Sequence, residues 1–182
     1  NYNDDELVLV EVASNQSIVE LKLDGISLGY RSMSEAPDRL MRWVVPYQSG
    51  ALTATADTGE QIIVATLETA TKATALDLSA DKARLRADGY DVVHVVAQFR
   101  DQKGRNVKTE NHKIKFSIEG DIRLLGVDNG AGDNVQDFQS NEITTDRGRA
   151  LAIFQANRKS GKAKVTVTAE GFEAQTLEFD LE

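Results

Sequence analysis

Short stretches of alternating apolar and polar residues, separated by turn sequences, run along this chain. The clearest stretch lies within residues 85–107, where Val93, Val95, Ala97 and Phe99 share one face of an extended segment. An Ala-Asp-Gly turn sequence precedes this segment, and Asp-Gln-Lys-Gly follows it. An apolar period of two residues between such turns is typical of a half-buried strand in an antiparallel sandwich. We therefore predict a framework strand here rather than a catalytic element.

Similar patterns predict strands over most of the chain. We expect them at residues 6–13, 17–23, 26–30, 40–45, 51–56, 61–67, 75–80, 93–99, 113–118, 122–127, 149–155, 164–170 and 174–181. The first stretch is apolar on both faces, which predicts burial on both sides or a position at a domain junction. Residues 33–38 are polar and contain Pro37, which indicates a loop. Residues 81–88 are too short for an independent helix, so we predict turn and strand there.

The best candidate for a domain boundary is residues 68–75, a run of small, β-compatible residues without glycine or proline. This composition predicts a short extended connection rather than a flexible tether. A chain of 182 residues is long enough for two small domains. Regularly spaced strands without an amphipathic helix predict an all-β fold of two tandem immunoglobulin-like β-sandwich domains, residues 1–70 and 71–182. Without cysteine, the Cys…Trp…Cys hallmark of antibody domains is missing.

Composition and charge narrow the range of partners. The formal net charge of −8 repels phosphate backbones and anionic membranes, so we expect no nucleic-acid partner. The apolar runs are far shorter than the ~20 residues that a membrane helix needs, so we expect no membrane insertion. The lack of cysteine excludes a disulfide framework, a thiolate nucleophile and a zinc–thiolate site. The chain begins at Asn1 rather than Met, which we interpret as a segment of a longer protein whose targeting signal is not included.

No catalytic constellation stands out in the sequence. The two histidines, His94 and His112, lie on a strand face and in a polar loop, where a structural role is the usual one. No Asp/Glu cluster accompanies them at a ligand spacing, so we predict no metal site. The 29 acidic residues fall mostly at strand faces and turn tips, and no pair can be chosen for glycoside hydrolysis. We therefore predict no catalytic, cofactor-binding or metal-binding residue, and no cofactor.

The glycine-rich loop at residues 128–134 reads Asp-Asn-Gly-Ala-Gly-Asp-Asn. Oxygen ligands and permissive glycines are the ingredients of a calcium loop, but the register and the downstream bidentate Glu of an EF-hand are missing. A sandwich loop that needs positive φ angles is the simpler interpretation. Whether the loop from Asp128 to Asn134 binds an ion stays open at this point.

Trp43 and Tyr47 are the candidate carbohydrate contacts. Together they could offer an apolar platform on which a pyranose ring stacks. A lone tryptophan in a strand of a small sandwich is more often part of the core, and that alternative stays open too.

Two segments of the first predicted domain resemble a known family. They are residues 17–29, Ser-Ile-Val-Glu-Leu-Lys-Leu-Asp-Gly-Ile-Ser-Leu-Gly, and residues 43–52, Trp-Val-Val-Pro-Tyr-Gln-Ser-Gly-Ala-Leu. They resemble the immunoglobulin-like domain that follows the catalytic barrel in bacterial glycoside hydrolase family 2 enzymes of the β-galactosidase type. Asp24 stands where that family usually has Asn, and Ser49 where it usually has Pro. Both residues suit turns, so the resemblance in fold is retained.

The second predicted domain carries an ordered set of turn and strand motifs. The set is Leu85-x-Ala87-Asp88-Gly89-x-Asp91, Asp101-x-x-Gly104, Phe116-x-Ile118-x-Gly120, Gly126-Val127-Asp128-Asn129-Gly130 and Gly148-Arg149-Ala150. In this order the motifs resemble the last, invasin-like domain of the same enzymes.

The resemblance implies a parent protein that hydrolyses β-galactosides or related glycosides by the retaining two-carboxylate mechanism. Its catalytic carboxylates would lie on a barrel that this chain does not contain, so the chain itself is not expected to be an enzyme. The implied role is a non-catalytic C-terminal accessory region that supports the barrel, dimerisation or substrate access. The implied partners are the catalytic domains of the parent chain, with carbohydrate and a second copy of the chain as further candidates. The family implies a periplasmic or extracellular bacterial location.

Two other classes of function stay open. The Asp88-Gly89 and Asp101-x-x-Gly104 motifs also resemble invasin-type repeats, so the chain could be a pair of immunoglobulin-like modules of a bacterial adhesin or surface protein. A carbohydrate-binding module using Trp43 and Tyr47 is the third possibility. The difference between the two predicted domains favours the hydrolase interpretation, because tandem adhesin modules would repeat one pattern.

Overall fold

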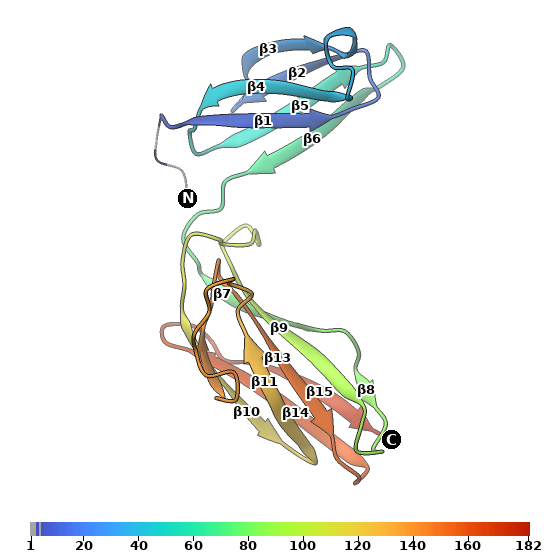
Figure 1. Ribbon diagram of the computed structural model, residues 1–182, viewed down its shortest axis with the longest axis vertical. Helices are drawn as coiled ribbons and strands as arrows, with labels where there is room; N and C mark the ends of the chain where they lie inside the picture. The colour runs from blue at the N-terminus through green and yellow to red at the C-terminus, as the bar shows by residue number, and fades with distance from the viewer. Residues whose placement is uncertain (1–2, 4) are drawn as a thin grey trace. The chain divides into compact units, whose positions relative to one another are not determined.

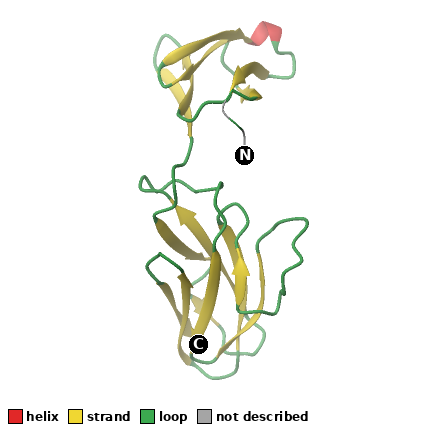
Figure 2. Ribbon diagram, turned by 90° about the vertical axis from the view of Figure 1, so that its left-hand side faces the viewer, coloured by secondary structure: helices red, strands yellow, loops and turns green. Residues whose placement is uncertain are grey.

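The computed structural model describes residue 3 and residues 5–182, and shows an all-β chain (Figures 1 and 2). The strands are β1 (Leu7–Ala13), β2 (Ile18–Leu23), β3 (Ile26–Ser32), β4 (Leu40–Pro46), β5 (Ala51–Asp57), β6 (Ile62–Glu68), β7 (Ala75–Ala80), β8 (Arg84–Leu85), β9 (Val92–Arg100), β10 (Lys113–Glu119), β11 (Ile122–Asp128), β12 (Glu142–Thr144), β13 (Arg149–Ala156), β14 (Gly161–Ala169) and β15 (Gln175–Leu181). A 3-10 turn, Met33–Glu35, occupies part of the predicted loop. The predicted all-β fold class is confirmed.

The chain divides into two compact units, Asn1–Thr69 and Ala70–Glu182. We refer to them as unit 1 and unit 2 and describe each by itself. Asn1, the first residue of the chain and of the first predicted domain, lies outside the described residues.

Unit 1 is a small sandwich in which a two-stranded sheet faces a four-stranded sheet. The strand orders are β1-β4 and β3-β2-β5-β6, with antiparallel pairing throughout. Alternate residues of each strand face the other sheet, as the two-residue period requires. The buried core consists of Val19, Leu21, Ala36, Met41, Trp43, Val45 and Ala56.

Of the two alternatives predicted for β1, burial on both sides is wrong, and a position at a domain junction stays a prediction. Leu7 and Leu9 are exposed, and only Val8, Val10 and Val12 point toward the core. The physical reason lies in the architecture: among the described residues, no second layer covers the outer face of the two-stranded sheet. The apolar residues on both faces of β1 therefore indicate one core face and one exposed apolar face, rather than a strand buried on both sides.

Unit 2 is a larger sandwich. A five-stranded sheet, β12-β10-β14-β15-β8, faces a four-stranded sheet, β11-β13-β9-β7. The predicted inward face of β9 is confirmed, because Val93, Val95, Ala97 and Phe99 are all completely buried. Strand β12 was not predicted; it adds only three residues to the edge of β10.

Candidate functional site

Trp43 lies in the core of unit 1 rather than on its surface. Its side chain is only 2% exposed, and its Nε1–H donates to the carbonyl oxygen of Gly29 at 3.2 Å. The Arg31 guanidinium lies 5.5 Å from the centre of the indole ring, within the range of a cation–π contact. Stacking on a pyranose needs an exposed ring face. The structure therefore gives Trp43 the core role that the sequence had left as an alternative, and leaves no indole face for a sugar.

Tyr47 follows β4 directly and is half-buried. Its N–H donates to the carbonyl oxygen of Glu6 at 2.8 Å, and its own carbonyl accepts from Asp5 N–H at 3.0 Å. Four residues of extended chain span roughly 13 Å, so Tyr47 and Trp43 are separated along the strand direction. The two candidate carbohydrate contacts do not form one stacking platform.

The two histidines form separate contacts with carboxylates. His94 Nδ1 lies 2.9 Å from Asp81 Oδ2, and the N–H of His94 donates to Asp81 Oδ1. Burial by itself would raise the pKa of Asp81, but these bonds from His94 outweigh it and lower that pKa. His112 packs against two aromatic rings of the core, and its Nε2 lies 3.1 Å from Glu110. Each imidazole is held by neighbours within unit 2.

The glycine-rich loop uses its polar groups to hold its own shape. Asp128 Oδ1 accepts from Asn134 Nδ2 at 3.0 Å and from Gly130 N–H at 3.2 Å, with Gly130 at a φ of +80°. The Asn134 amide, together with the main-chain donor, keeps the pKa of Asp128 low. Asn129 ties the loop to the carbonyl of Thr144. Within the described part of the chain, no group of three or more His, Cys, Asp or Glu side chains is placed to hold a metal ion.

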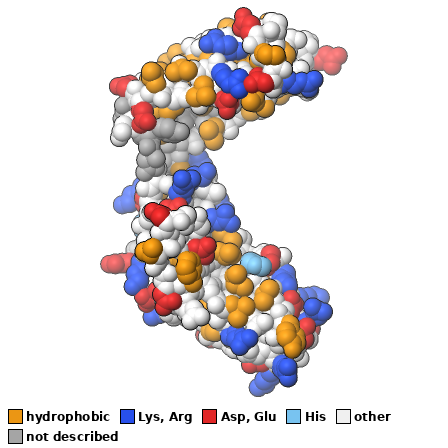
Figure 3. All heavy atoms as spheres, viewed as in Figure 1, with side chains coloured by type: hydrophobic (Ala, Val, Ile, Leu, Met, Phe, Trp, Pro, Cys, Tyr) orange, Lys and Arg blue, Asp and Glu red, His pale blue; other side chains and the backbone are white. Residues whose placement is uncertain are grey.

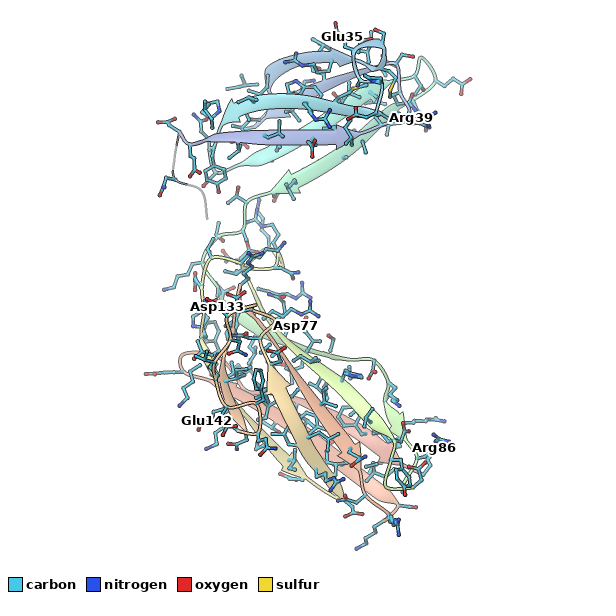
Figure 4. All side chains as sticks on the ribbon, viewed as in Figure 1. Glu35, Arg39, Asp77, Arg86, Asp133 and Glu142 are labelled. Atoms are coloured by element: carbon cyan, nitrogen blue, oxygen red, sulfur yellow. The ribbon has the colours of Figure 1, made fainter. Side chains whose placement is uncertain are left out.

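Figure 4 places Asp133 in this loop and Glu142 in the strand after it. Glu142 forms ion pairs with Lys113 at 2.6 Å and Lys115 at 3.3 Å, which join β12 to β10. The Lys113 ammonium is the largest cause of the lowered pKa of Glu142. This carboxylate belongs to a strand-to-strand contact.

Asp101 is the most heavily bonded carboxylate of unit 2. It is buried, and it accepts from the Arg105 guanidinium at 2.6 Å, the N–H of Lys103 at 2.9 Å and the N–H of Thr71 at 3.0 Å. The Arg105 guanidinium holds the pKa of this carboxyl well below its usual range. Sequence reasoning identified a turn carboxylate, but it missed the link to Thr71. No local signal could have revealed that link, because the two residues meet only in the folded unit.

An exposed apolar surface on unit 1 is the strongest candidate for contact with another protein. We call it the small-sheet face and define it as Leu7, Leu9, Val44 and Pro46. Leu9 pairs with Val44 and Leu7 with Pro46 across β1 and β4, and Leu7, Leu9 and Val44 are 70%, 58% and 65% exposed. Adjacent exposed apolar residues with a charged margin are typical of protein contact sites. Arg42 supplies part of that margin, in ion pairs with Glu11 and Asp38.

Unit 2 carries a second, less exposed apolar strip on the outer face of its four-stranded sheet. Val96 of β9 pairs with Leu151 of β13, and both are half-buried. Leu125 of β11 is partly exposed near the same face. Figure 3 shows hydrophobic side chains gathered on the visible side of this unit.

These observations define the class of protein: a chain of β-sandwich architecture with exposed apolar surfaces on both units. Among the described residues, no helix is long and apolar enough to cross a membrane. The chain belongs to the glycoside hydrolase family 2 C-terminal domain 5 family, whose profile matches residues 76–178. A domain of unknown function (DUF4982) matches residues 5–63. The family membership confirms the resemblance that the motifs of residues 85–150 predicted.

Individual relatives agree with this assignment. The chain is 28% identical over 165 residues to the β-galactosidase BoGH2A of Bacteroides ovatus, a match that covers 90% of this chain and 19% of the relative. It is 30% identical over 116 residues to a β-galactosidase of Thermoanaerobacter pseudethanolicus, covering 62% of this chain and 14% of the relative. A solved structure of a glycosyl hydrolase family 2 member from Bacteroides cellulosilyticus matches with a TM-score of 0.90 and 30% identity, covering 98% of this chain and 23% of that one. The chain therefore spans less than a quarter of the length of these relatives.

Proposed function

We propose that this chain is the non-catalytic C-terminal accessory region of a family 2 glycoside hydrolase of the β-galactosidase type. The family match supports the placement at the C-terminal side, and the names of the curated relatives support the activity of the parent protein. Residues 1–70 and 71–182 would be its two tandem immunoglobulin-like domains. The catalytic carboxylates would lie in the part of the relatives that this chain does not span.

The observation that carries the proposal is the small-sheet face. This face consists of Leu7, Leu9, Val44 and Pro46. Covering it with another surface would stabilise the contact by ~25 cal/mol for each Å² of apolar area removed from water. In a longer hydrolase the catalytic domains would be the nearest surfaces available. Packing of this face against them would support the barrel, and a contact between two copies would support dimerisation instead.

Hydrolysis assays test the proposal directly. The isolated chain is incubated with a chromogenic β-galactoside, and the longer natural polypeptide is assayed beside it. We expect hydrolysis by the longer polypeptide and no rate above a buffer blank for the isolated chain. Hydrolysis by a clean preparation of the isolated chain would overturn the non-catalytic assignment. Further β repeats without glycosidase activity in the longer polypeptide would favour the adhesin alternative.

A further inference from the structure

Strand β6 of unit 1 has a core-side face that the small sheet leaves uncovered. Ile63 and Leu67 pair with Ala56 and Leu52 of β5, so their side chains lie on the side of the sheet that faces the other layer. On β2 the same side is buried, and Val19 is only 2% exposed. Ile63 and Leu67 are nevertheless 41% and 73% exposed. The four-stranded sheet therefore has two strands more than the sheet that covers it, and the core-side face of β6 is left exposed.

The small sheet has its open edge on the side of β6. Two hydrogen bonds join β3 to β4: Arg31 Nε–H donates to the carbonyl of Arg42 at 3.0 Å, and the carbonyl of Gly29 accepts from Trp43 Nε1–H at 3.2 Å. Since β3 and β6 are the two edges of the four-stranded sheet, β4 lies over the β3 half and β1 lies toward β6. Figure 1 shows β1 and β6 along the same margin of this unit. In keeping with this, the core-side residues Val8, Val10 and Val12 of β1 are only half-buried, whereas those of β4 are buried.

The outer edge of β1 presents main-chain groups to this open side. The carbonyl oxygen of Arg42 accepts from Arg31 of β3, so Arg42 and Glu11 form a non-hydrogen-bonded pair of the β1–β4 ladder. In such a pair the main-chain N–H and C=O groups point away from the partner strand, so those of Glu11 point away from β4. Hydrogen-bonded and non-bonded pairs alternate along an antiparallel ladder, so Leu7, Leu9 and Ala13 point the same way as Glu11. In the described part of the chain, β1 pairs with β4 alone. An unpaired row of donors and acceptors of this kind is a template for another strand.

A pocket of about 470 Å³ opens between the two sheets at the Ala13 end of β1. Its apolar lining comes from Val12, Leu40, Ala54, Ile63 and Ala65, and the adjoining loops add polar residues such as Asn15, Gln16 and Arg39. Neighbouring strands lie about 4.8 Å apart, so one added strand beside β1 would occupy the space above β6. Immunoglobulin-like sandwiches have roughly three or four strands in each sheet, whereas the small sheet here has two. The open edge of β1, the uncovered face of β6 and this pocket all indicate space for one more strand.

We infer that the open space beside β1 and above β6, which we call the slot, accepts one additional β-strand, antiparallel to β1 and supplied by the same polypeptide upstream of β1. The inference rests on the proposed function, in which this region is part of a longer hydrolase chain. A turn directly before β1 favours an upstream origin: Glu6 N–H donates to the Asn3 carbonyl at 3.1 Å, and Asp5 has a φ of +67°. A turn at this position allows the chain to reverse along β1. The strand would have alternating apolar residues, with its apolar side on Ile63 and Leu67.

Cysteine labelling tests this inference cleanly, because the chain has no cysteine of its own. Ile63→Cys places a thiol on the uncovered face, and Ile62→Cys places the control thiol on the opposite face of the same strand. Both variants are made in the isolated chain and in the longer hydrolase, and maleimide labelling rates are read by peptide mass spectrometry. We expect the rate at Ile63→Cys to fall at least about tenfold in the longer hydrolase, while Ile62→Cys stays fast in both.

A second pair of changes shows whether the main chain of β1 holds the strand. Leu9→Pro removes an outward donor without removing a bond to β4, whereas Leu9→Thr keeps that donor. We expect Leu9→Pro to restore fast labelling of Ile63→Cys in the longer hydrolase and Leu9→Thr to leave it slow. Equal labelling of Ile63→Cys in both chains would overturn the inference, as would protection that appears only in a dimer of the isolated chain. If the longer polypeptide hydrolyses glycosides in either case, the proposed function stands apart from this result.

Discussion

The indole Nε1–H of Trp43 donates to the carbonyl oxygen of Gly29 at 3.2 Å and so ties β4 to β3. This contact accounts for the burial of the only tryptophan in the chain. It also anchors β4 at the β3 side of unit 1, which leaves the edge of β1 on the side of β6. This hydrogen bond therefore argues against a carbohydrate-stacking role for Trp43, and it explains why the slot lies beside β1.

Replacing Trp43 with Phe removes the donor of that bond. The carbonyl of Gly29 is half-buried, and the loss of its partner costs about 1 kcal/mol, so we expect the free energy of unfolding of unit 1 to fall by about that amount. Calorimetry of the isolated chain measures the effect. Tyr90→Phe, at an exposed residue of unit 2, is the control and should leave the unfolding unchanged. Equal stability of Trp43→Phe and the unaltered chain would contradict the core role.

Carbohydrate binding can be tested on the same residue. Because Trp43 is the only tryptophan and is buried, its fluorescence reports on the core of unit 1. We expect blue-shifted emission that does not change when galacto-oligosaccharides are titrated into the chain. A saturable change in emission would show that a sugar binds near Trp43 and would support the carbohydrate-binding alternative.

Asp101 should make the stability of unit 2 dependent on acidic pH. The Arg105 guanidinium lowers the pKa of this carboxyl in the folded chain, so the folded state favours the ionised form. Its stabilising contribution is then fully present above the unfolded pKa of about 3.9 and is lost as the pH falls toward the folded pKa. We expect Asp101→Asn to lower the melting temperature by at least about 4 °C at neutral pH, with a smaller difference below about pH 4.

The matched control for Asp101 is Asp133→Asn, which changes an exposed carboxylate of the same unit. Its melting temperature should follow that of the unaltered chain at every pH. A pH-independent difference between Asp101→Asn and the unaltered chain would show that shape, rather than charge, accounts for the effect.

Gly148 occupies a position where a side chain does not fit. Its φ is +67°, and an added Cβ would lie 2.1 Å from the carbonyl oxygen of Val107. The left-handed conformation alone costs a non-glycine residue roughly 1–2 kcal/mol, and the clash adds to that cost. We expect Gly148→Ala to destabilise unit 2 by at least about 2 kcal/mol in urea unfolding. Gly132→Ala, in a loop with open space around it, should change little; equal effects would contradict this account.

Much of the fold could be predicted because most strands carry their own local pattern. The strand that contains Val93, Val95, Ala97 and Phe99 alternates cleanly between two turns, and tertiary packing agrees with that pattern. Strand β12 is three residues long and is held by pairing with β10, so it has no local signature. Burial of the outer face of β1 was predicted wrongly, because a buried strand and a strand with an exposed apolar face have the same sequence pattern.

The candidate site was harder to predict than the fold. Sequence alone could place Trp43 in a strand but not choose between core and surface, since that depends on which layer lies opposite. The slot beside β1 depends on strand order and register, which join residues as distant as Val12 and Ile63. Such relationships exist only after the sheets have formed.

The central claim is that the small-sheet face packs against other parts of a longer hydrolase. The most direct measurement compares Leu9→Asp with Ile26→Asp, two changes at exposed apolar residues of unit 1, in the isolated chain and in the longer hydrolase. In the isolated chain neither change should alter the free energy of unfolding. In the longer hydrolase we expect Leu9→Asp to lower it by about 1.5–3 kcal/mol, the value of a buried leucine, while Ile26→Asp has no effect. Equal effects of the two substitutions in the longer hydrolase would contradict the claim.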